Sequence, residues 1–182
     1  KCMSMVRCLH QSGITVAHSF DIRERISFYE KLCRSHGALL FEDYEEVRGW
    51  MDWLMDTLDS MEHPKCLCHI DANVDNFLFF EDGSVKLLDW EYAGMCDPVM
   101  DVSMCAIYSY YNEEDMERLF RLYLQREPSE DELFALYANA ALGGFLWCLW
   151  AVYKSILGDE FGEYTIIMYR YAKKYYRKLR KL

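Results

Sequence analysis

The sequence lacks internal repeats, low-complexity stretches and any Pro-, Gly- or Ser-rich segment long enough to act as a linker. Proline occurs three times and glycine nine times in 182 residues. Nothing along the chain therefore marks a boundary between domains. Since 52% of the residues are hydrophobic and 16% are aromatic, the chain can bury a substantial core, and we predict a single domain over residues 1–182.

Basic residues are scarce outside the C-terminal end. Residues 169–182 hold seven Lys or Arg and no acidic residue, so the preceding part carries 13 basic against 30 acidic side chains. An acidic body argues against nucleic acid as a substrate and suits a cationic one. The basic tail could bind nucleic acid or an anionic membrane, but its interleaved tyrosines favour a terminal helix that packs on its own acidic domain.

No signal peptide is recognisable at the start, and the eight cysteines have irregular spacing. Both features are typical of reduced thiols in a cytoplasmic protein. Cys66-x-Cys68 beside His69 could belong to a zinc site, yet such sites usually need two ligand pairs and only Cys96 is close in sequence. The favoured interpretation is that Cys66 and Cys68 are small apolar residues on one face of a buried strand.

Helices account for most of the remaining chain. We predict helices over residues 5–10, 21–37, 101–111 and 113–125, another from 43 that ends before Pro64, and the C-terminal one. Capping boxes open three of the helical segments: Asp21-x-x-Glu24, Asp43-x-x-Glu46 and Ser129-x-x-Glu132. In the helix from residue 43, a 3.6-residue period predicts one buried stripe, made of Val47, Trp50, Met51, Leu54, Leu58 and Met61.

The segment after Ser129 contains no charged residue from Leu133 to Tyr153, which is long enough to span a membrane. Asn139, the pair Gly143-Gly144 and the lack of a basic anchor before Lys154 instead favour a helix buried within an all-helical domain. We therefore expect no transmembrane segment.

One stretch carries residues suited to chemistry. A polar loop with His69, Asp71 and Asn76 follows an apolar run, and two short β-rich runs joined at Asp82-Gly83 form a hairpin that leads to Asp89. A carboxylate can accept a proton from a hydroxyl, and an Asn with a second Asp supplies hard oxygen ligands for magnesium. These side chains predict phosphoryl transfer. Separately, each could be a loop cap or a polar strand end.

The pattern His69-x-Asp71-x-x-x-x-Asn76 followed by Asp89 resembles the catalytic loop and metal-binding Asp of the protein-kinase-like phosphotransferases. Trp90-Glu91-Tyr92-Ala-Gly94 and Asp97-Pro98-x-x-Asp101 are similar to the choline and ethanolamine kinase branch, the bacterial choline kinase-like proteins in particular. Leu146-Trp147-Cys-Leu-Trp150 and Glu160-Phe-Gly162 also resemble that branch, so the similarity covers most of the chain. It implies a mainly α fold with a small β-hairpin, the C-terminal helical lobe of a kinase-like fold.

The resemblance implies a role for each matching residue. Asp71 would be the catalytic base, with His69 as an organiser of the loop, and Asn76 and Asp89 would hold Mg²⁺ on the phosphates of ATP. Asp97 and Asp101 would hold the loop in place from below, and Asp75 would be solvated. In this scheme the catalytic loop covers residues 66–80, the metal-binding segment 85–101 and the acceptor-substrate helices 130–182.

The acceptor site is expected around Trp147 and Trp150. At i and i+3 they project from the same side of a helix, where aromatic faces can attract a quaternary ammonium group. The alternative is that this pair belongs to the core. Glu91 could attract a cation or anchor its loop, and Tyr164 could close the aromatic cage, although Glu163 departs here from the eukaryotic pattern.

Neither a Gly-rich phosphate loop nor a strand lysine precedes His69, and the chain begins with Lys. We therefore expect the N-terminal ATP-binding lobe to be absent and this polypeptide alone to be inactive. The sequence predicts ATP-dependent phosphotransfer to choline or a related amino alcohol. The alternatives are an aminoglycoside phosphotransferase-like kinase and a non-catalytic binding module. The oligomeric state and the choice between choline and ethanolamine stay open.

Overall fold

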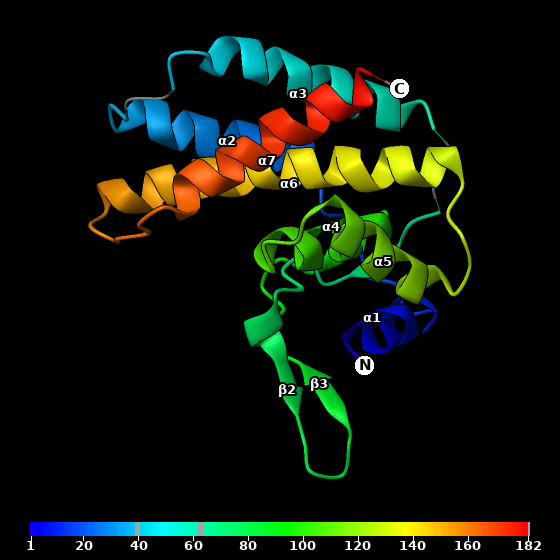
Figure 1. Cartoon of the computed structure of the whole chain (residues 1–182). Helices are drawn as coiled ribbons and strands as arrows, with labels where there is room; N and C mark the ends of the chain where they lie inside the picture. The colour runs from blue at the N-terminus through cyan, green and yellow to red at the C-terminus, as the bar shows by residue number, and fades with distance from the viewer. Residues whose placement is uncertain (39–40, 62–63, 182) are drawn as a thin grey trace. The chain divides into compact units, whose positions relative to one another are not determined.

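The computed structural model describes residues 1–38, 41–61 and 64–181. Its internal contacts divide the chain into two compact units, one formed by Lys1–Phe20 with Glu62–Asn139 and the other by Asp21–Met61 with Ala140–Leu182. Each unit is described by itself. The predicted mainly α fold with a small hairpin is confirmed, because the long elements are helices and each strand has three residues (Figure 1).

The first unit contains the segment from His69 to Asp89, which carries the predicted catalytic and metal-binding residues, together with three helices. They are α1 (Cys2–His10), α4 (Val99–Tyr108) and α5 (Glu113–Leu124). Helix α5 is capped by Asn112, whose side chain accepts a hydrogen bond from the amide of Asp115. Helix α4 starts and ends earlier than the predicted 101–111. It begins just after Pro98, which has a helical φ of −57°, and it ends before the left-handed Tyr110.

Two small antiparallel sheets complete this unit. Strand β1 (Cys66–Cys68) pairs with β4 (Gly94–Cys96), so that Cys66 lies opposite Cys96. The sequence analysis did not identify β4. The predicted hairpin is formed by β2 (Phe77–Phe79) and β3 (Val85–Leu87), with Phe77 opposite Leu87. A 3-10 turn, η1 (Val74–Asn76), connects the loop after β1 to β2.

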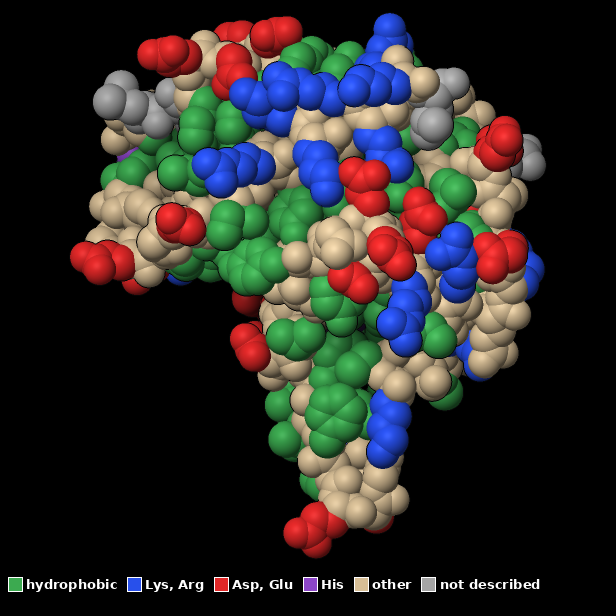
Figure 2. Space-filling view, viewed as in Figure 1, with side chains coloured by type: hydrophobic (Ala, Val, Ile, Leu, Met, Phe, Trp, Pro, Cys, Tyr) green, Lys and Arg blue, Asp and Glu red, His purple; other side chains and the backbone are tan. Residues whose placement is uncertain are grey.

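The hairpin projects from the first unit (Figure 1), while its strand β3 stays in contact with α1. Its apolar side chains are exposed to an unusual degree: Leu78 is 44%, Phe79 54% and Phe80 40% accessible. Figure 2 shows the same hydrophobic surface running along the hairpin. An exposed apolar surface of this kind marks a place where another structure or a ligand docks.

The second unit contains α2 (Ile22–Ser35), α3 (Tyr44–Asp59) and α7 (Tyr164–Leu179). The cap of α2 is confirmed, because Asp21 accepts hydrogen bonds from the amides of Arg23 and Glu24. The cap of α3 is not as predicted. Asp43 occupies the N-cap position, but its side chain accepts no hydrogen bond from the amides of the first turn. Its carboxylate instead accepts from the Tyr169 hydroxyl at 2.8 Å and forms an ion pair with Lys173, both on α7.

The buried stripe of α3 is narrower than predicted. Val47, Met51 and Leu54 are fully buried, whereas Trp50, Leu58 and Met61 are only partly covered. Trp50 stacks on Tyr176 of α7 with the ring centroids 4.6 Å apart, and the guanidinium of Arg177 lies over its ring. The C-terminal helix therefore packs on its own unit, as the interleaved tyrosines suggest, while its Lys and Arg side chains gather on the surface (Figure 2).

The long apolar segment forms helix α6 (Glu130–Ile156), which belongs to the first unit up to Asn139 and to the second from Ala140. Its capping box is confirmed: Ser129 Oγ accepts from the amide of Glu132, and the Glu132 carboxylate accepts from the amide of Ser129. Within the described residues, α6 is the one helix long and apolar enough to cross a membrane, yet 83% of its most apolar window is buried in the protein. Its hydrophobicity is that of a core helix.

Gly144 allows α6 and α7 to approach closely, and its replacement tests this packing. A Cβ at this position would lie 2.6 Å from the backbone oxygen of Met168 and 2.9 Å from Cβ of Tyr171. We expect Gly144→Ala to lower the free energy of unfolding by about 1–3 kcal/mol, because backbone must shift to make room. Urea denaturation measures the change.

Gly49 on α3 provides the control, since nothing lies within 4 Å of its added Cβ. There the same substitution should be neutral or should stabilise the protein by up to about 1 kcal/mol, through helix propensity alone. Equal effects at the two glycines would contradict the close approach of α6 and α7.

Candidate active site

The loop after β1 brings Asp71 and Asn76 together. Asn73 caps the turn η1 by accepting hydrogen bonds from the amides of Asp75 and Asn76. Its own Nδ2 donates to Asp71 Oδ1 at 3.1 Å. Nδ2 of Asn76 donates to the other carboxylate oxygen of Asp71 at 3.0 Å and to its backbone oxygen at 2.8 Å. The Asp71 carboxylate is thus fixed from two sides, although sequence reasoning did not identify Asn73.

Partial burial sets the protonation behaviour of Asp71. Desolvation raises the pKa of its carboxyl group above the usual value, and the hydrogen bonds from Asn73, Tyr108 and Asn76 act in the opposite direction. A carboxylate with a raised pKa is a better proton acceptor than a solvated one. Tyr108, at the end of α4, also lies outside the set of residues predicted from the sequence.

Asp89 is placed next to Asn76 by the hairpin. The amide of Leu88 donates to the backbone oxygen of Asn76 at 2.9 Å, which extends the register of the pair Phe77 and Leu87 by one residue. Asp89 follows with a left-handed backbone, φ 62°, and its side chain is exposed. Nδ2 of Asn76 is bonded to Asp71, which leaves Oδ1 of Asn76 as a possible metal ligand. The Asp89 carboxylate is a second possible oxygen ligand at the same end of the hairpin. Such a donor set fits Mg²⁺, which keeps several waters.

Asp101 holds the loop from beneath. Its carboxylate is fully buried and accepts from the amide of His69 at 2.8 Å, the amide of Ile70 at 2.6 Å and Nε2 of His10 at 2.9 Å. Ile70 has a φ of 72°, a strained conformation for a β-branched residue that costs about 1–3 kcal/mol. The Asp101 carboxylate stabilises this turn, which is the positioning task that the sequence analysis assigned to it.

His69 lies behind the loop. It is fully buried, with Nε2 2.8 Å from the backbone oxygen of Leu88 and its ring edge-on to Trp90. Among the described residues its Nδ1 has no hydrogen-bond partner. Through Leu88, His69 links the catalytic loop to the end of β3, an arrangement that suits an organiser of the loop.

The other predicted site residues of this unit have separate positions. Asp97 accepts from the amide of Val99 at 2.8 Å and so fixes the start of α4. Glu91 is exposed in the turn after Asp89. His10, which binds Asp101 from α1, was missed because it precedes the loop by some sixty residues in sequence, and no local pattern connects the two.

The predicted aromatic residues lie in the second unit. The rings of Trp147 and Trp150 are 5.9 Å apart and nearly perpendicular. Phe161 lies 5.0 Å from Trp150, and Tyr164 lies 6.2 Å from Phe161. Trp147 is only 3% exposed and belongs to the core, whereas Trp150 is partly accessible and has the Lys154 ammonium over its ring at 5.9 Å. The face of Trp150 therefore already attracts a cation within its own helix.

Comparison with known proteins agrees with the geometry of the loop. The model of the phosphotransferase enzyme family matches residues 9–137, which is more than half of the chain. The chain belongs to this family. Protein LicA of Haemophilus influenzae is 27% identical to this phosphotransferase family member over 167 residues, a match that covers 87% of the chain and 48% of LicA.

Two solved structures are similar over nearly the whole chain. The choline kinase LicA from Streptococcus pneumoniae has a TM-score of 0.84 at 28% identity, covering 98% of this chain and 62% of that one. A choline/ethanolamine kinase family protein from Mesorhizobium loti has a TM-score of 0.85 at 26% identity, covering 95% and 60%. LicA has also been solved in complex with AMP. This phosphotransferase chain thus spans about half to two thirds of the length of its relatives.

The three bonds to Asp101 lead to a prediction about stability. We expect Asp101→Asn to lower the free energy of unfolding by about 2–4 kcal/mol, because an amide replaces a charged acceptor that buried N–H groups need. The exposed carboxylate of Asp75 provides the control, and Asp75→Asn should stay within about 0.5 kcal/mol of the wild type in the same urea experiment. Similar values for both variants would contradict the anchoring role of Asp101.

Proposed function

We propose that the protein to which this chain belongs transfers the γ-phosphate of ATP to the hydroxyl of choline or a related amino alcohol. The observation that carries the proposal is the hydrogen bond from Asn76 to the Asp71 carboxylate, at the end of the hairpin that also carries the exposed Asp89. This end of the hairpin thus holds a proton acceptor and two side chains with oxygen ligands for a metal, which is the set that phosphoryl transfer to a hydroxyl requires. Family membership and the names of the relatives support the same reaction class.

In this proposal Asp71 orients the acceptor hydroxyl and receives its proton. The bonds from Asn73 and Asn76 hold both carboxylate oxygens, so the group does not need to reorganise during the reaction. Its raised pKa keeps it a competent acceptor near neutral pH. Asn76 Oδ1 and the Asp89 carboxylate would hold Mg²⁺, which supplies stabilisation of negative charge on the phosphates.

The apolar surface of the hairpin fits a role in nucleotide binding. Leu78, Phe79 and Phe80 are exposed beside the cluster, and Leu88 and Trp90 are 45% and 42% accessible. We propose that this surface is covered by an ATP-binding part that lies outside these 182 residues, and that the 182-residue chain alone is inactive. In the same scheme, residues 66–80 form the catalytic loop, residues 85–101 the metal-binding segment and residues 130–182 the acceptor helices.

The acceptor side is assigned to the aromatic group of the second unit. Trp150 and Phe161 are in contact, Tyr164 continues the row, and Trp147 supports Trp150 from the core. Aromatic faces favour a quaternary ammonium group. This composition favours choline over the polycationic aminoglycosides, which acidic side chains would be expected to bind.

An acceptor comparison tests the proposal. The full-length enzyme with ATP and Mg²⁺ should phosphorylate choline or ethanolamine and not kanamycin, in an assay that detects the phosphorylated product. Asp71→Asn should lower turnover by about two to four orders of magnitude, because the proton acceptor is removed while the shape is kept. Choline affinity, measured by calorimetry, should be unchanged.

Asp75→Asn, at the exposed middle residue of the turn η1, is the matched control and should retain full turnover. Phosphorylation of kanamycin alone would favour the aminoglycoside alternative. Absence of turnover with every acceptor, together with absence of nucleotide binding, would favour a non-catalytic binding module.

Trp150 provides a separate test of the acceptor site. Trp150→Leu keeps an apolar side chain but removes the aromatic face, so we expect the Michaelis constant for choline to rise by about 2- to 30-fold, as one contact of about 0.5–2 kcal/mol implies. The Michaelis constant for ATP should not change, and Trp150→Tyr should restore most of the loss.

Trp53→Leu on α3 is the control, because its indole packs against Tyr176 in the same unit. It should leave both Michaelis constants unaltered. A parallel rise for choline and ATP in Trp150→Leu would indicate damage to the core instead of a lost binding contact.

A further inference from the structure

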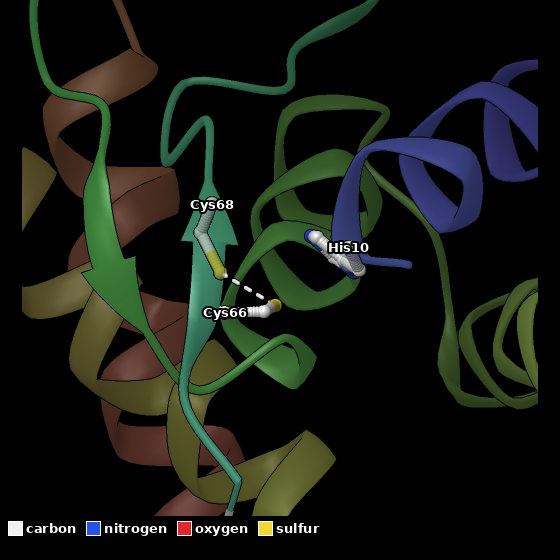
Figure 3. A group of neighbouring side chains, drawn as sticks. All are labelled: His10, Cys66 and Cys68. Atoms are coloured by element: carbon white, nitrogen blue, oxygen red, sulfur yellow. Dashed lines mark hydrogen bonds between the residues drawn. The ribbon is translucent and has the colours of Figure 1, made fainter. Parts of the chain in front are cut away.

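Three metal-ligating side chains meet beside β1, away from the phosphotransfer residues. Cys66 and Cys68 come from the strand, and His10 is the last residue of α1. One ligand atom from each of the three lies within 4.8 Å of the other two. Figure 3 shows both thiols and the imidazole turned toward one another. No pattern in the sequence connects His10 with the two cysteines. Without His10, the pair Cys66-x-Cys68 has no third ligand in this cluster.

The two sulfur atoms have the spacing that a single cation needs. Residues two apart on a strand share one face, and the sulfur atoms of Cys66 and Cys68 are 3.8 Å apart. Two metal–sulfur bonds of about 2.3 Å at a tetrahedral angle place the sulfur atoms about 3.8 Å apart. The strand thus presents both thiols at the separation found around tetrahedral Zn²⁺.

His10 is oriented to present its remaining nitrogen to the cluster. Its Nε2 is 2.9 Å from the Asp101 carboxylate, which can only accept, so Nε2 carries the proton. Nδ1 then offers a lone pair, which the hydroxyl of Tyr123 occupies at 2.8 Å. A carboxylate behind a histidine fixes the tautomer and the ring direction of many metal-binding histidines. Because the Tyr123 oxygen lies on the side of Nδ1 where a cation would sit, the Tyr123 side chain must move away when the cation binds.

The two thiols differ in accessibility. Cys68 is buried, and its sulfur also lies 3.5 Å from the backbone oxygens of Cys96 and Asp97. Cys66 is only partly buried, which leaves a path for a cation.

We propose that His10, Cys66 and Cys68 form a binding site for one thiophilic divalent cation of the Zn²⁺ type, with water in the fourth position. Two sulfurs and an imidazole suit Zn²⁺ and exclude Mg²⁺ and Ca²⁺, which prefer oxygen ligands. The site is distinct from the oxygen donors Asn76 and Asp89. It is also connected to the catalytic loop, because Asp101 bonds both His10 and the amides of His69 and Ile70. A bound cation would hold this anchor in place.

Titration of the reduced 182-residue protein with Co²⁺ tests the site. We expect one equivalent to give the sulfur-to-cobalt charge-transfer absorption and the visible bands of tetrahedral Co²⁺, and Zn²⁺ to abolish both by displacement. Cys66→Ser should weaken binding at least tenfold and reduce the charge-transfer band. His10→Ala should weaken binding to a similar extent while the sulfur band stays. Cys8→Ser, which alters an exposed cysteine of α1, should bind as the wild type does.

Alkylation of the wild-type protein provides a test that needs no variant to fold. Zn²⁺ should protect Cys66 from iodoacetamide, while Cys8 in the same sample reacts at an unchanged rate, as followed by peptide mass spectrometry. It should also raise the midpoint of thermal unfolding, because the cation binds the folded state. Equal alkylation of Cys66 with and without Zn²⁺, or a charge-transfer band and a cobalt affinity in Cys66→Ser equal to those of the wild type, would overturn the proposal.

Discussion

The buried carboxylate of Asp101 is the interaction on which the first unit depends. A charged group without solvent must be satisfied by hydrogen bonds, and this one receives three, from two consecutive backbone amides and one imidazole. Those bonds compel Ile70 into a left-handed conformation and thereby set the direction in which the chain leaves β1. The position of Asp71 follows from that direction, so the placement of its carboxylate depends on the buried carboxylate of Asp101.

A second constraint ties the loop that carries Asn76 to the hairpin that carries Asp89. The loop and the hairpin meet through the bond between Leu88 and Asn76 and through the contact of His69 with the oxygen of Leu88. Both bonds involve backbone, so the side chain of Asp89 remains available at the end of β3. The chemistry of this family is thus placed on short strands and turns whose geometry is maintained by buried polar groups rather than by a large sheet.

Much of this could be predicted from the sequence where the signal is local. The caps at Asp21, Asn112 and Ser129, the hairpin at Asp82-Gly83 and the order His69, Asp71, Asn76, Asp89 each depend on residues a few positions apart. Predictions that depended on distant partners were less successful. Asp43 carries the pattern of a helix cap, but Lys173 and Tyr169 compete for its carboxylate. Strand β4 consists of Gly94, Met95 and Cys96, whose pairing with β1 no periodicity reveals. His10 and Asn73 have no recognisable motif of their own.

The backbone of Asp89 has a consequence for how this position can change over evolutionary time. Its φ of 62° belongs to a region that glycine, asparagine and aspartate enter readily and that longer side chains avoid. Glutamate, the usual substitute for a carboxylate, is therefore disfavoured by conformation, whereas asparagine and glycine fit the turn but carry no charge. Aspartate is the acidic residue that enters this region readily, so the turn itself limits which carboxylate can stand at this position.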